Sequence, residues 1–461
     1  MKLEQLDVLC KRHQALLLHS NEAMLCIAVV GTPSPELLEA LRFATQKRVD
    51  IECWEAARME QHLRVESHSH LPAIADEQEN AVALLNRMFE QALAQRASDI
   101  HIEPDEQCLR IRLRVDGVLH TQPLVGASLA PTLTARLKVL GNLDIAERRL
   151  PQDGQFTITI TNEPVSFRIA TLPCRHGEKV VLRLLHRQEQ ALELSAAGMS
   201  PLQLAQFTHA LLQPQGLILV TGPTGSGKTV TLYRALQRRN TPEVNLCSVE
   251  DPVEIPLAGI NQTQVNPRAG LTFQSILRAL LRQDPDIVMV GEIRDTETAE
   301  IAIKAAQTGH LVLSTLHTNS TSETLTRLQQ MGVASWMVSS ALLLVVAQRL
   351  VRKLCPHCQQ SASEDIVLPP SLWPRPLAHR QATGCKRCYH GYYGRVALFE
   401  LLPIGNDIRH GITTAMSARE IEHLARQAGM TTLFESGCDA VEKGLTSWEE
   451  IVRVLGIPNV Q

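Results

Sequence analysis

One eight-residue segment constrains the fold of this chain more than any other. It follows an apolar run at residues 217–221 that reads as a strand, and it precedes a helical pattern at 230–239. A glycine-rich turn in this setting lets backbone N–H groups converge on phosphate oxygens, and the helix N-terminus adds partial positive charge. A chance glycine-rich turn would lack both flanks. The segment therefore predicts a site for ATP and Mg²⁺, formed by Gly222, Pro223, Thr224, Gly225, Ser226, Gly227, Lys228 and Thr229.

The surrounding residues, 200–353, predict an α/β core. Apolar segments at 217–221, 245–249, 287–290 and 311–315 are separated mostly by helical patterns. Short apolar strands alternating with helices are typical of a parallel sheet that is buried on both faces. In such sheets, ligands bind beyond the carboxyl ends of the strands. We therefore expect the functional side chains at those ends.

Two carboxylates stand at such ends. Glu250 follows the strand at 245–249, and Glu292 follows the strand at 287–290 after one glycine. Hydrolysis of a phosphoanhydride needs a group that orients or activates water and a carboxylate that holds hydrated Mg²⁺. We predict these tasks for Glu250 and Glu292. The alternative is that both acids merely cap the helices that follow.

Two histidines flank the last of these strands. His310 precedes it and His317 follows it. Residues 311–316 would span roughly 20 Å at about 3.3 Å per residue, so the two side chains cannot both touch one phosphate if the strand has that length. Taken alone, each histidine could equally be structural.

A smaller α/β unit is predicted at residues 80–190. It begins with a helix at 81–96. The segment at 109–115 then alternates strictly, which places Arg110, Arg112 and Arg114 on one strand face and apolar residues on the other. Before it, residues 1–63 mix a strand at 25–30 with a helix at 35–45, and the polar residues 64–79 read as a linker.

Four of the 11 cysteines form two Cys-x-x-Cys pairs, separated by 26 residues. Four thiolates at this spacing predict a closed tetrahedral zinc site with a structural role. Two unrelated redox pairs are the alternative. The predicted zinc-binding subdomain spans 354–392, and a helical C-terminal segment spans 393–461. The ligands would be Cys355, Cys358, Cys385 and Cys388.

Charge and hydropathy narrow the partners. The formal net charge of −3 argues against a broad basic surface for nucleic acid. No segment approaches the ~18 apolar residues of a membrane span, and the N-terminus lacks the pattern of a signal peptide. We expect a cytoplasmic protein that meets membranes only through partners.

Several longer motifs resemble the ATPases of type II secretion and type IV pilus assembly, and especially the pilus-assembly branch. The resemblance covers about residues 80–455. The matching segments are RASDIHIE (96–103), DIAERRLPQDG (144–154), GEKVVLR (177–183), VEDPVEI (249–255), RQDPD (282–286), GEIRD (291–295) and TGHLVLSTLHTN (308–319).

This resemblance implies a RecA-like core, a preceding PAS-like domain and a homohexamer. It implies that Glu250, Glu292, His310 and His317 belong to the nucleotide site, and that Arg168 and Arg183 of the smaller domain approach the nucleotide. Those arginines could instead be a solvated sheet face. It also supports zinc at the cysteines.

The function it implies is a motor for a pilus or a type II secretion pseudopilus. Such a motor would act through a polytopic inner-membrane platform protein and lie peripheral to that membrane. The arginine-containing repeats of relatives that bind cyclic dinucleotides are absent from the sequence, so we expect no such regulation.

Two other functions compete with this one. A DNA-translocating or recombination ATPase would use the same core, but no nucleic-acid-binding module is recognisable. A nucleotide-binding scaffold without turnover is the second alternative. The intact Lys228, Thr229, Glu250 and Glu292 argue against it.

Overall fold

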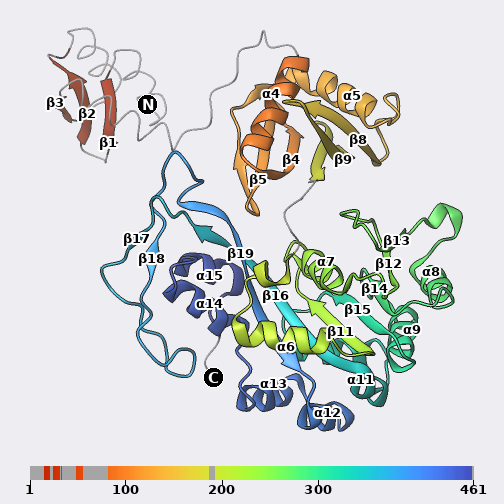
Figure 1. The fold of residues 1–461 in the computed structure, drawn as a ribbon. Coiled ribbons are helices and arrows are strands. Elements are labelled where there is room, and N and C mark those ends of the chain that lie inside the picture. Colours follow the sequence, from red (N-terminus) through yellow and green to blue (C-terminus); the bar gives the residue numbers. More distant parts are fainter. Residues whose placement is uncertain are drawn as a thin grey trace.

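The four predicted core strands lie in one sheet (Figure 1). They are β11 (Gly216–Thr221), β12 (Leu246–Glu250), β14 (Ile287–Val290) and β15 (Leu311–Leu316), and they pair in the parallel order β12-β14-β15-β11. A further parallel strand, β13 (Asn261–Gln264), extends the β12 edge. The computed structural model describes residues 15–20, 24–31, 33, 48–54, 81–185 and 193–458. The predicted α/β core is therefore present.

Helices cover both faces of this sheet because alternate strand residues point to opposite sides. Leu217 and Leu219 pack with α8 (Phe273–Leu280) and α9 (Thr296–Gln307), joined by α10 (Thr321–Gln330) and α11 (Ser335–Ala341). Ile218 and Val220 pack with α6 (Pro201–Leu211) and α7 (Lys228–Arg239). Full burial of each such side chain stabilises the fold by about 1.5–3 kcal/mol. This packing holds the carboxyl ends of the strands in place.

Two long strands that the sequence analysis did not assign complete the sheet. β16 (Leu342–Leu354) pairs parallel with β11, and β19 (Tyr392–Pro403) pairs antiparallel with β16. The sheet thus continues past residue 353. Between these strands, β17 (Gln360–Ser361) and β18 (Arg380–Gln381) form a small ladder.

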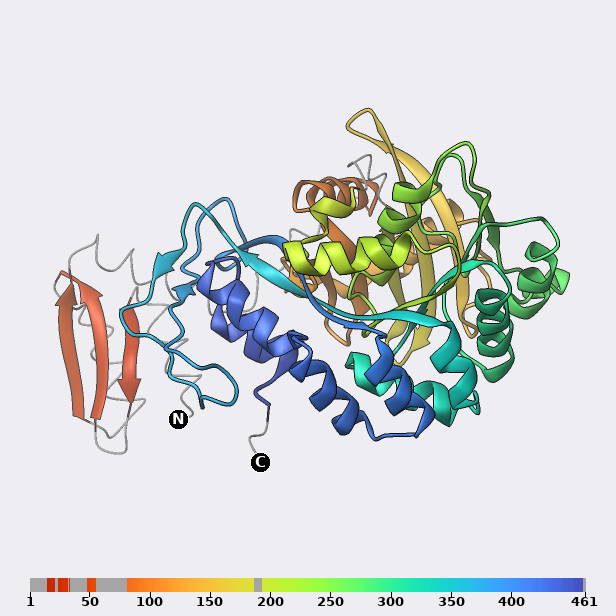
Figure 2. The ribbon, with the colours of Figure 1, turned by 60° about the horizontal axis from the view of Figure 1, so that its bottom comes forward.

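Helices make up the C-terminal part of the chain from residue 406, whereas residues 393–403 of the predicted helical segment belong to strand β19. α12 (Asn406–Thr413) and α13 (Ala418–Gln427) join the core cluster that contains α9 and α11. α14 (Leu433–Glu442) and α15 (Trp448–Leu455) pack on β16 and β19 through Ala347, Val351 and Leu398. Figure 2 shows these helices, in blue, as a row along one side of the molecule.

Residues 81–185 form a separate antiparallel sheet with the order β6-β5-β4-β10-β9-β8. Helices α4 (Ala81–Ala94) and α5 (Ala130–Leu140) contribute to its apolar core. The predicted alternation is confirmed, since Leu109, Ile111, Leu113 and Val115 are buried. The strands are β4 (Ala97–Pro104), β5 (Cys108–Val115), β6 (Val118–Thr121), β7 (Val125–Gly126), β8 (Gln152–Ile160), β9 (Glu163–Cys174) and β10 (Gly177–Leu185).

The N-terminal strands form a third sheet. β2 (Met24–Val30), the predicted strand, pairs antiparallel with β1 (Ala15–Ser20) and parallel with β3 (Arg48–Trp54). The predicted helix at 35–45 and the linker at 64–79 lie outside the described residues. Among the helices that are described, none has the length and apolar character needed to cross a membrane.

Candidate functional site

The phosphate loop lies between β11 and α7 and packs closely against β16. A Cβ atom on Gly222 would lie 2.5 Å from the carbonyl oxygen of Gln348, and one on Gly227 would lie 2.8 Å from the Gln348 Nε2 atom. Gly227 also has a φ of 87°, which glycine adopts at little cost. Both glycines are therefore required for the approach of the loop to β16.

Lys228 opens α7 and points back into the loop. Its Nζ atom donates to the carbonyl oxygens of Gly222 (2.8 Å) and Pro223 (3.1 Å). Burial lowers the pKa of Lys228 to about 8, although the charge of Glu292 opposes this shift. Nearby, the buried Ser226 hydroxyl has no hydrogen-bond partner among the described residues. A buried ammonium and an unpartnered hydroxyl in a ring of backbone groups fit the phosphates of a nucleotide with its Mg²⁺.

Sequence reasoning missed the side chains that brace this loop. Gln348 Nε2 donates to the Ser226 carbonyl oxygen (2.8 Å), and Thr231 Oγ1 of α7 donates to Gln348 Oε1 (2.7 Å). The neighbouring Arg349 donates to the Asn319 carbonyl oxygen (3.0 Å). A polar pair that directly follows the apolar run at 341–347 was the available signal. A buried polar pair inside a sheet needs partners, and here the partners are the loop and the end of β15.

Glu292 lies beside His317, at the ends of neighbouring strands β14 and β15. The His317 Nε2 atom is 3.5 Å from a Glu292 oxygen. Arg294 also forms an ion pair with Glu292 and lies 3.9 Å from Asp251. Burial lowers the pKa of His317, and the positive charge of Lys228 lowers it further while Glu292 opposes both. The Glu292 side chain is 17% exposed and that of His317 is 47% exposed, so water can reach this pair.

Glu250 has a different environment. It is only 2% exposed, and its carboxylate accepts hydrogen bonds from Tyr233, Ser248 (2.6 Å) and Gln262 (3.1 Å). The Tyr233 hydroxyl in turn accepts a hydrogen bond from the backbone N–H of Glu254 (3.2 Å). Tyr233 lies on α7, so this group of contacts ties the helix behind the phosphate loop to the turn after β12. Tyr233 alone gave no local sequence signal, because an aromatic residue in a helix reads as core.

The structure does not bring the two histidines together. His310 Nδ1 lies 3.0 Å from the carbonyl oxygen of Ala305, and the His310 carbonyl oxygen accepts a hydrogen bond from Gly216 at the start of β11. The phosphate loop begins at the other end of β11. The geometry within one chain therefore separates His310 from the loop and agrees with the strand-length argument, and the role that the resemblance implies for His310 stays a prediction.

Arg168 and Arg183 face each other on β9 and β10, on the sheet face that is not covered by helices. Arg183 Nε donates to Asp99 (2.9 Å), and this hydrogen bond raises the pKa of Arg183, with a smaller contribution from Glu254 of the core. Arg168 lies 3.8 Å from Asp153. Within the described part of the chain, no hydrogen bond or ion pair joins either arginine to the phosphate loop.

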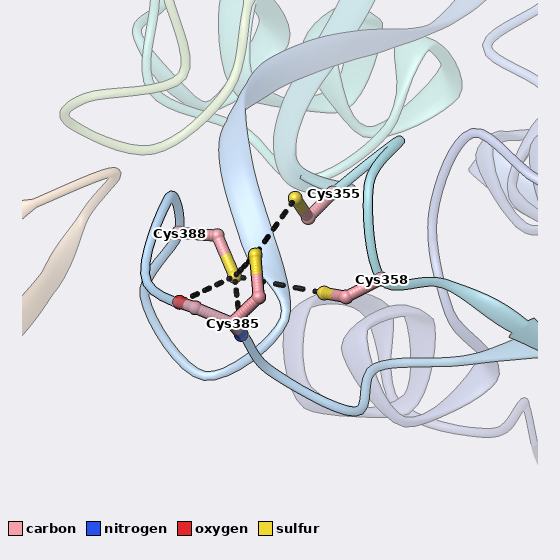
Figure 3. Close-up of side chains that lie close together, drawn as sticks. All are labelled: Cys355, Cys358, Cys385 and Cys388. Carbon is pink, nitrogen blue, oxygen red and sulfur yellow. Dashed lines mark hydrogen bonds between the residues drawn. The ribbon is translucent and has the colours of Figure 1, made fainter.

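The four predicted metal-binding cysteines converge between β16 and β19 (Figure 3). Their ligand atoms all lie within 4.8 Å of one another, with Sγ–Sγ separations of 3.9 Å for Cys355–Cys385, 3.7 Å for Cys358–Cys388 and 3.6 Å for Cys385–Cys388. A tetrahedron with Zn–S bonds of about 2.3 Å has edges of about 3.8 Å. The residues therefore fit a zinc ion, with no ligand position left open for substrate.

The loop, its flanking strand and helix, and the carboxylates at the ends of β12 and β14 define a P-loop NTPase. The chain belongs to the family described as type II/IV secretion system proteins, whose profile matches residues 75–453. Membership in this family, together with the intact phosphate loop, makes the chain a P-loop ATPase.

Three relatives are similar over most of their length. The chain is 64% identical over 459 residues to the protein transport protein HofB homolog of Escherichia coli K12, with 100% of both chains covered. It is 48% identical to the type IV pilus assembly ATPase PilB of Acinetobacter baylyi, over 81% of this chain and 66% of that relative. It is 47% identical to the type II secretion system ATPase E of Vibrio cholerae, over 81% of this chain and 75% of that relative.

The fold has a counterpart among solved structures. The pilus retraction motor PilT with bound ADP matches 81% of this chain and 97% of its own, with a TM-score of 0.55 and 25% sequence identity. This match supports the P-loop ATPase fold on grounds independent of the sequence motifs.

Proposed function

We propose that this chain is an ATP-hydrolysing hexameric motor that drives assembly of a type IV pilus or a type II secretion pseudopilus. The observation that carries the proposal is the convergence of Lys228, Glu292 and His317 beside a phosphate loop that already has its folded geometry. The similarity to pilus-assembly and secretion ATPases supplies the process. Their identities of 48% and 47% favour neither process over the other.

Each residue at this edge takes one role in the proposal. Lys228 binds the terminal phosphates, and Thr229 ligates Mg²⁺, which supplies charge neutralisation when bound. Glu292 orients the attacking water, because it is the more exposed carboxylate and lies beside His317. His317 positions the Glu292 carboxylate and contacts the bound phosphates. Glu250, buried and fully hydrogen-bonded, positions the turn after β12 rather than touching water.

In phosphoryl transfer, an arginine from another domain or a partner often stabilises the charge of the transition state. Arg294 is engaged by Glu292 and Asp251. We therefore assign the task to Arg168 and Arg183, brought to a nucleotide by closure of the 81–185 sheet over its own core or a neighbour's core in the ring. That closure would be the stroke delivered to a cytoplasmic loop of a polytopic inner-membrane platform protein. A zinc ion at the cysteine quartet completes the proposed cofactors.

The units of the motor follow the sequence division in this proposal. They are 1–63, the linker 64–79, 80–190, 200–353, 354–392 and 393–461. The separate sheet of residues 81–185 supports the unit at 80–190. The pairing of β19 with β16 means that the last unit shares a sheet with the core.

Phosphate release measured against protein concentration tests the proposal, with the size of the assembly followed in parallel. We expect specific activity to rise as rings form and to fall strongly in Arg168→Ala and Arg183→Ala. Arg110→Ala is the matched control. Arg110 lies on the same face of the sheet, but it is near the start of β5 and pairs with Asp105 (2.9 Å). Flat specific activity from monomer to hexamer, with both arginine variants unaffected, would contradict the proposal.

A further inference from the structure

The residues that follow the last cysteine form a tight turn, here called the 389–394 turn. Tyr389 and Tyr392 exchange both backbone hydrogen bonds, at 3.0 and 2.9 Å. His390 and Gly391 between them have φ values of 48° and 84°, as in the two-residue turns of β-hairpins. The Gly391 carbonyl oxygen accepts a hydrogen bond from the Cys355 N–H (2.8 Å). The turn is therefore tied directly to the backbone of the cysteine quartet.

The C-terminal helices fix the other side of this turn. Tyr392 is buried, and its hydroxyl lies 2.7 Å from the Ser447 hydroxyl at the start of α15. The Arg352 guanidinium stacks 3.9 Å from the centre of the Tyr392 ring and forms an ion pair with the buried Glu450 (2.7 Å). Burial raises the pKa of Glu450, but hydrogen bonds from Arg453 and Arg352 outweigh this and lower it to about 2. The turn thus has a rigid base.

The exposed side of the turn meets the hairpin between β5 and β6 of the other sheet. Asp116, in the first position of that hairpin turn, accepts a hydrogen bond from the Gly394 N–H (2.9 Å). Arg96 lies over the Tyr393 ring, 3.8 Å from its centre, and is 3.5 Å from Asp116. Asp116, Arg96 and the Tyr393 ring therefore join the two units. The Asp116–Gly394 contact spans 278 residues of sequence.

Aromatic contacts extend this junction. The His120 ring of β6 lies 4.7 Å from the Tyr389 ring and stacks at 15° on the His390 ring, with the ring centres 5.7 Å apart. Tyr389 also packs against the apolar core of the 81–185 sheet. In Figure 1 the lower end of β5 points toward the start of β19. The 389–394 turn therefore forms a specific contact surface for the β5–β6 hairpin rather than a chance surface contact.

We propose that the 389–394 turn is the docking element that positions the arginine-bearing sheet over its own core. The hairpin it holds is continuous with the row Arg114, Asp99 and Arg183, which are neighbours across β5, β4 and β10. Fixing one end of this row sets where Arg183 lies relative to Glu254 and the nucleotide edge. The cysteine quartet is bonded to the backbone of the turn, so it contributes through the turn to the position of Arg183. The turnover part of this inference rests on the proposed ATPase function, whereas the docking part does not.

Hydrogen exchange on the full-length, nucleotide-free protein tests the docking directly. In Tyr393→Ala we expect exchange about threefold to tenfold faster in peptides covering 112–121 and 389–396, because the aromatic face under Arg96 is lost. Tyr393→Phe is the matched control, since it retains that face and should exchange like the parent. Asp116→Asn is a second variant on the opposite unit. This substitution removes the negative charge that faces Arg96. Asparagine tolerates the left-handed backbone at this position, and residue 116 lies in the other unit from the cysteines.

Turnover supplies the second readout. Tyr393→Ala should lower kcat about threefold to tenfold, with the affinity for ATP unchanged, because docking affects the arginines and not the phosphate loop. Unchanged exchange at 112–121 in both Tyr393→Ala and Asp116→Asn would overturn the docking proposal, whatever the ATPase activity. Faster exchange with unchanged kcat would overturn the positioning role. A parent protein without ATPase activity would overturn the proposed function while leaving the exchange result to be judged separately.

Discussion

Two regions of this molecule bring polar groups together as candidate sites for a small ligand, and they are built in opposite ways. The phosphate loop is held by the fold itself. Gln348 braces its backbone, and Lys228 donates to carbonyl oxygens of the loop. In the quartet, the thiols of Cys355, Cys358, Cys385 and Cys388 all lie within 4.8 Å of one another, in loops between two strands.

The difference concerns what the ligand contributes. A nucleotide would enter a cradle whose shape is set by β11, α7 and β16, so its binding energy is available for catalysis. A zinc ion would instead supply the cross-link that its loops need, as structural zinc does in small domains. The first region should therefore lose activity without losing structure when its ligand-binding groups are removed, and the second should lose structure first.

The largest effect is expected for Lys228→Ala. The Lys228 ammonium points into the phosphate loop and would neutralise the terminal phosphates, so turnover should fall about a thousandfold in a phosphate-release assay. The zinc content should stay that of the parent. Lys304→Ala is the control, because Lys304 is exposed and pairs with Glu300 in the same helix (3.2 Å). Turnover of Lys228→Ala within threefold of the parent would contradict the phosphate-loop assignment.

Cys358→Ser should have the next largest effect. Metal analysis should find one zinc per parent chain and none in the variant, because a serine hydroxyl is a poor zinc ligand. Limited proteolysis should then cut between residues 355 and 392, while ATP affinity stays within about threefold of the parent. Cys174→Ser, at an exposed cysteine outside the quartet, should retain the metal. A zinc-free parent that resists the protease would refute the structural role.

A smaller effect is expected from pH. The pKa of Lys228 is lowered to about 8 by burial, so the free ammonium loses its proton as pH rises through 8. Bound phosphate requires the charged form, and the affinity for ATP should therefore weaken roughly tenfold between pH 7 and pH 9. Lys228→Arg remains charged across this range and should bind ATP with little dependence on pH. Equal pH dependence in both proteins would show that another group is responsible.

The same two regions show how far a sequence predicts a site. The phosphate loop, the core strands around it and the cysteine quartet were predictable, because each depends on local periodicity or on fixed spacing within a short segment. The brace from Gln348 to Ser226 joins residues 122 apart, and the contact of Glu250 with Tyr233 depends on how α7 lies against β12. The pairing of β16 with β19 likewise depends on which edge of the sheet remains available. Contacts of this kind are set by packing, and local patterns do not contain them.

The family resemblance implied several site residues, and the structure places them in different environments. It placed His310 and His317 in one site, whereas the two lie at opposite ends of β15. It treated Glu250 and Glu292 alike, whereas one is enclosed by three donors and the other is open to water. Position along β15 decided the first case and burial decided the second, and both follow from the assembled sheet rather than from any motif.

The central claim is that Glu292 orients water at a phosphate loop that the fold has already built. Its most direct test measures bound nucleotide and released phosphate on the same samples of parent, Glu292→Gln and Glu250→Gln. We predict that Glu292→Gln keeps ATP bound and uncleaved, with turnover lowered about a hundredfold or more and thermal stability unchanged. Glu250→Gln should lower thermal stability, since an amide places donors against Tyr233, Ser248 and Gln262. Phosphate release by Glu292→Gln within threefold of the parent would contradict the account.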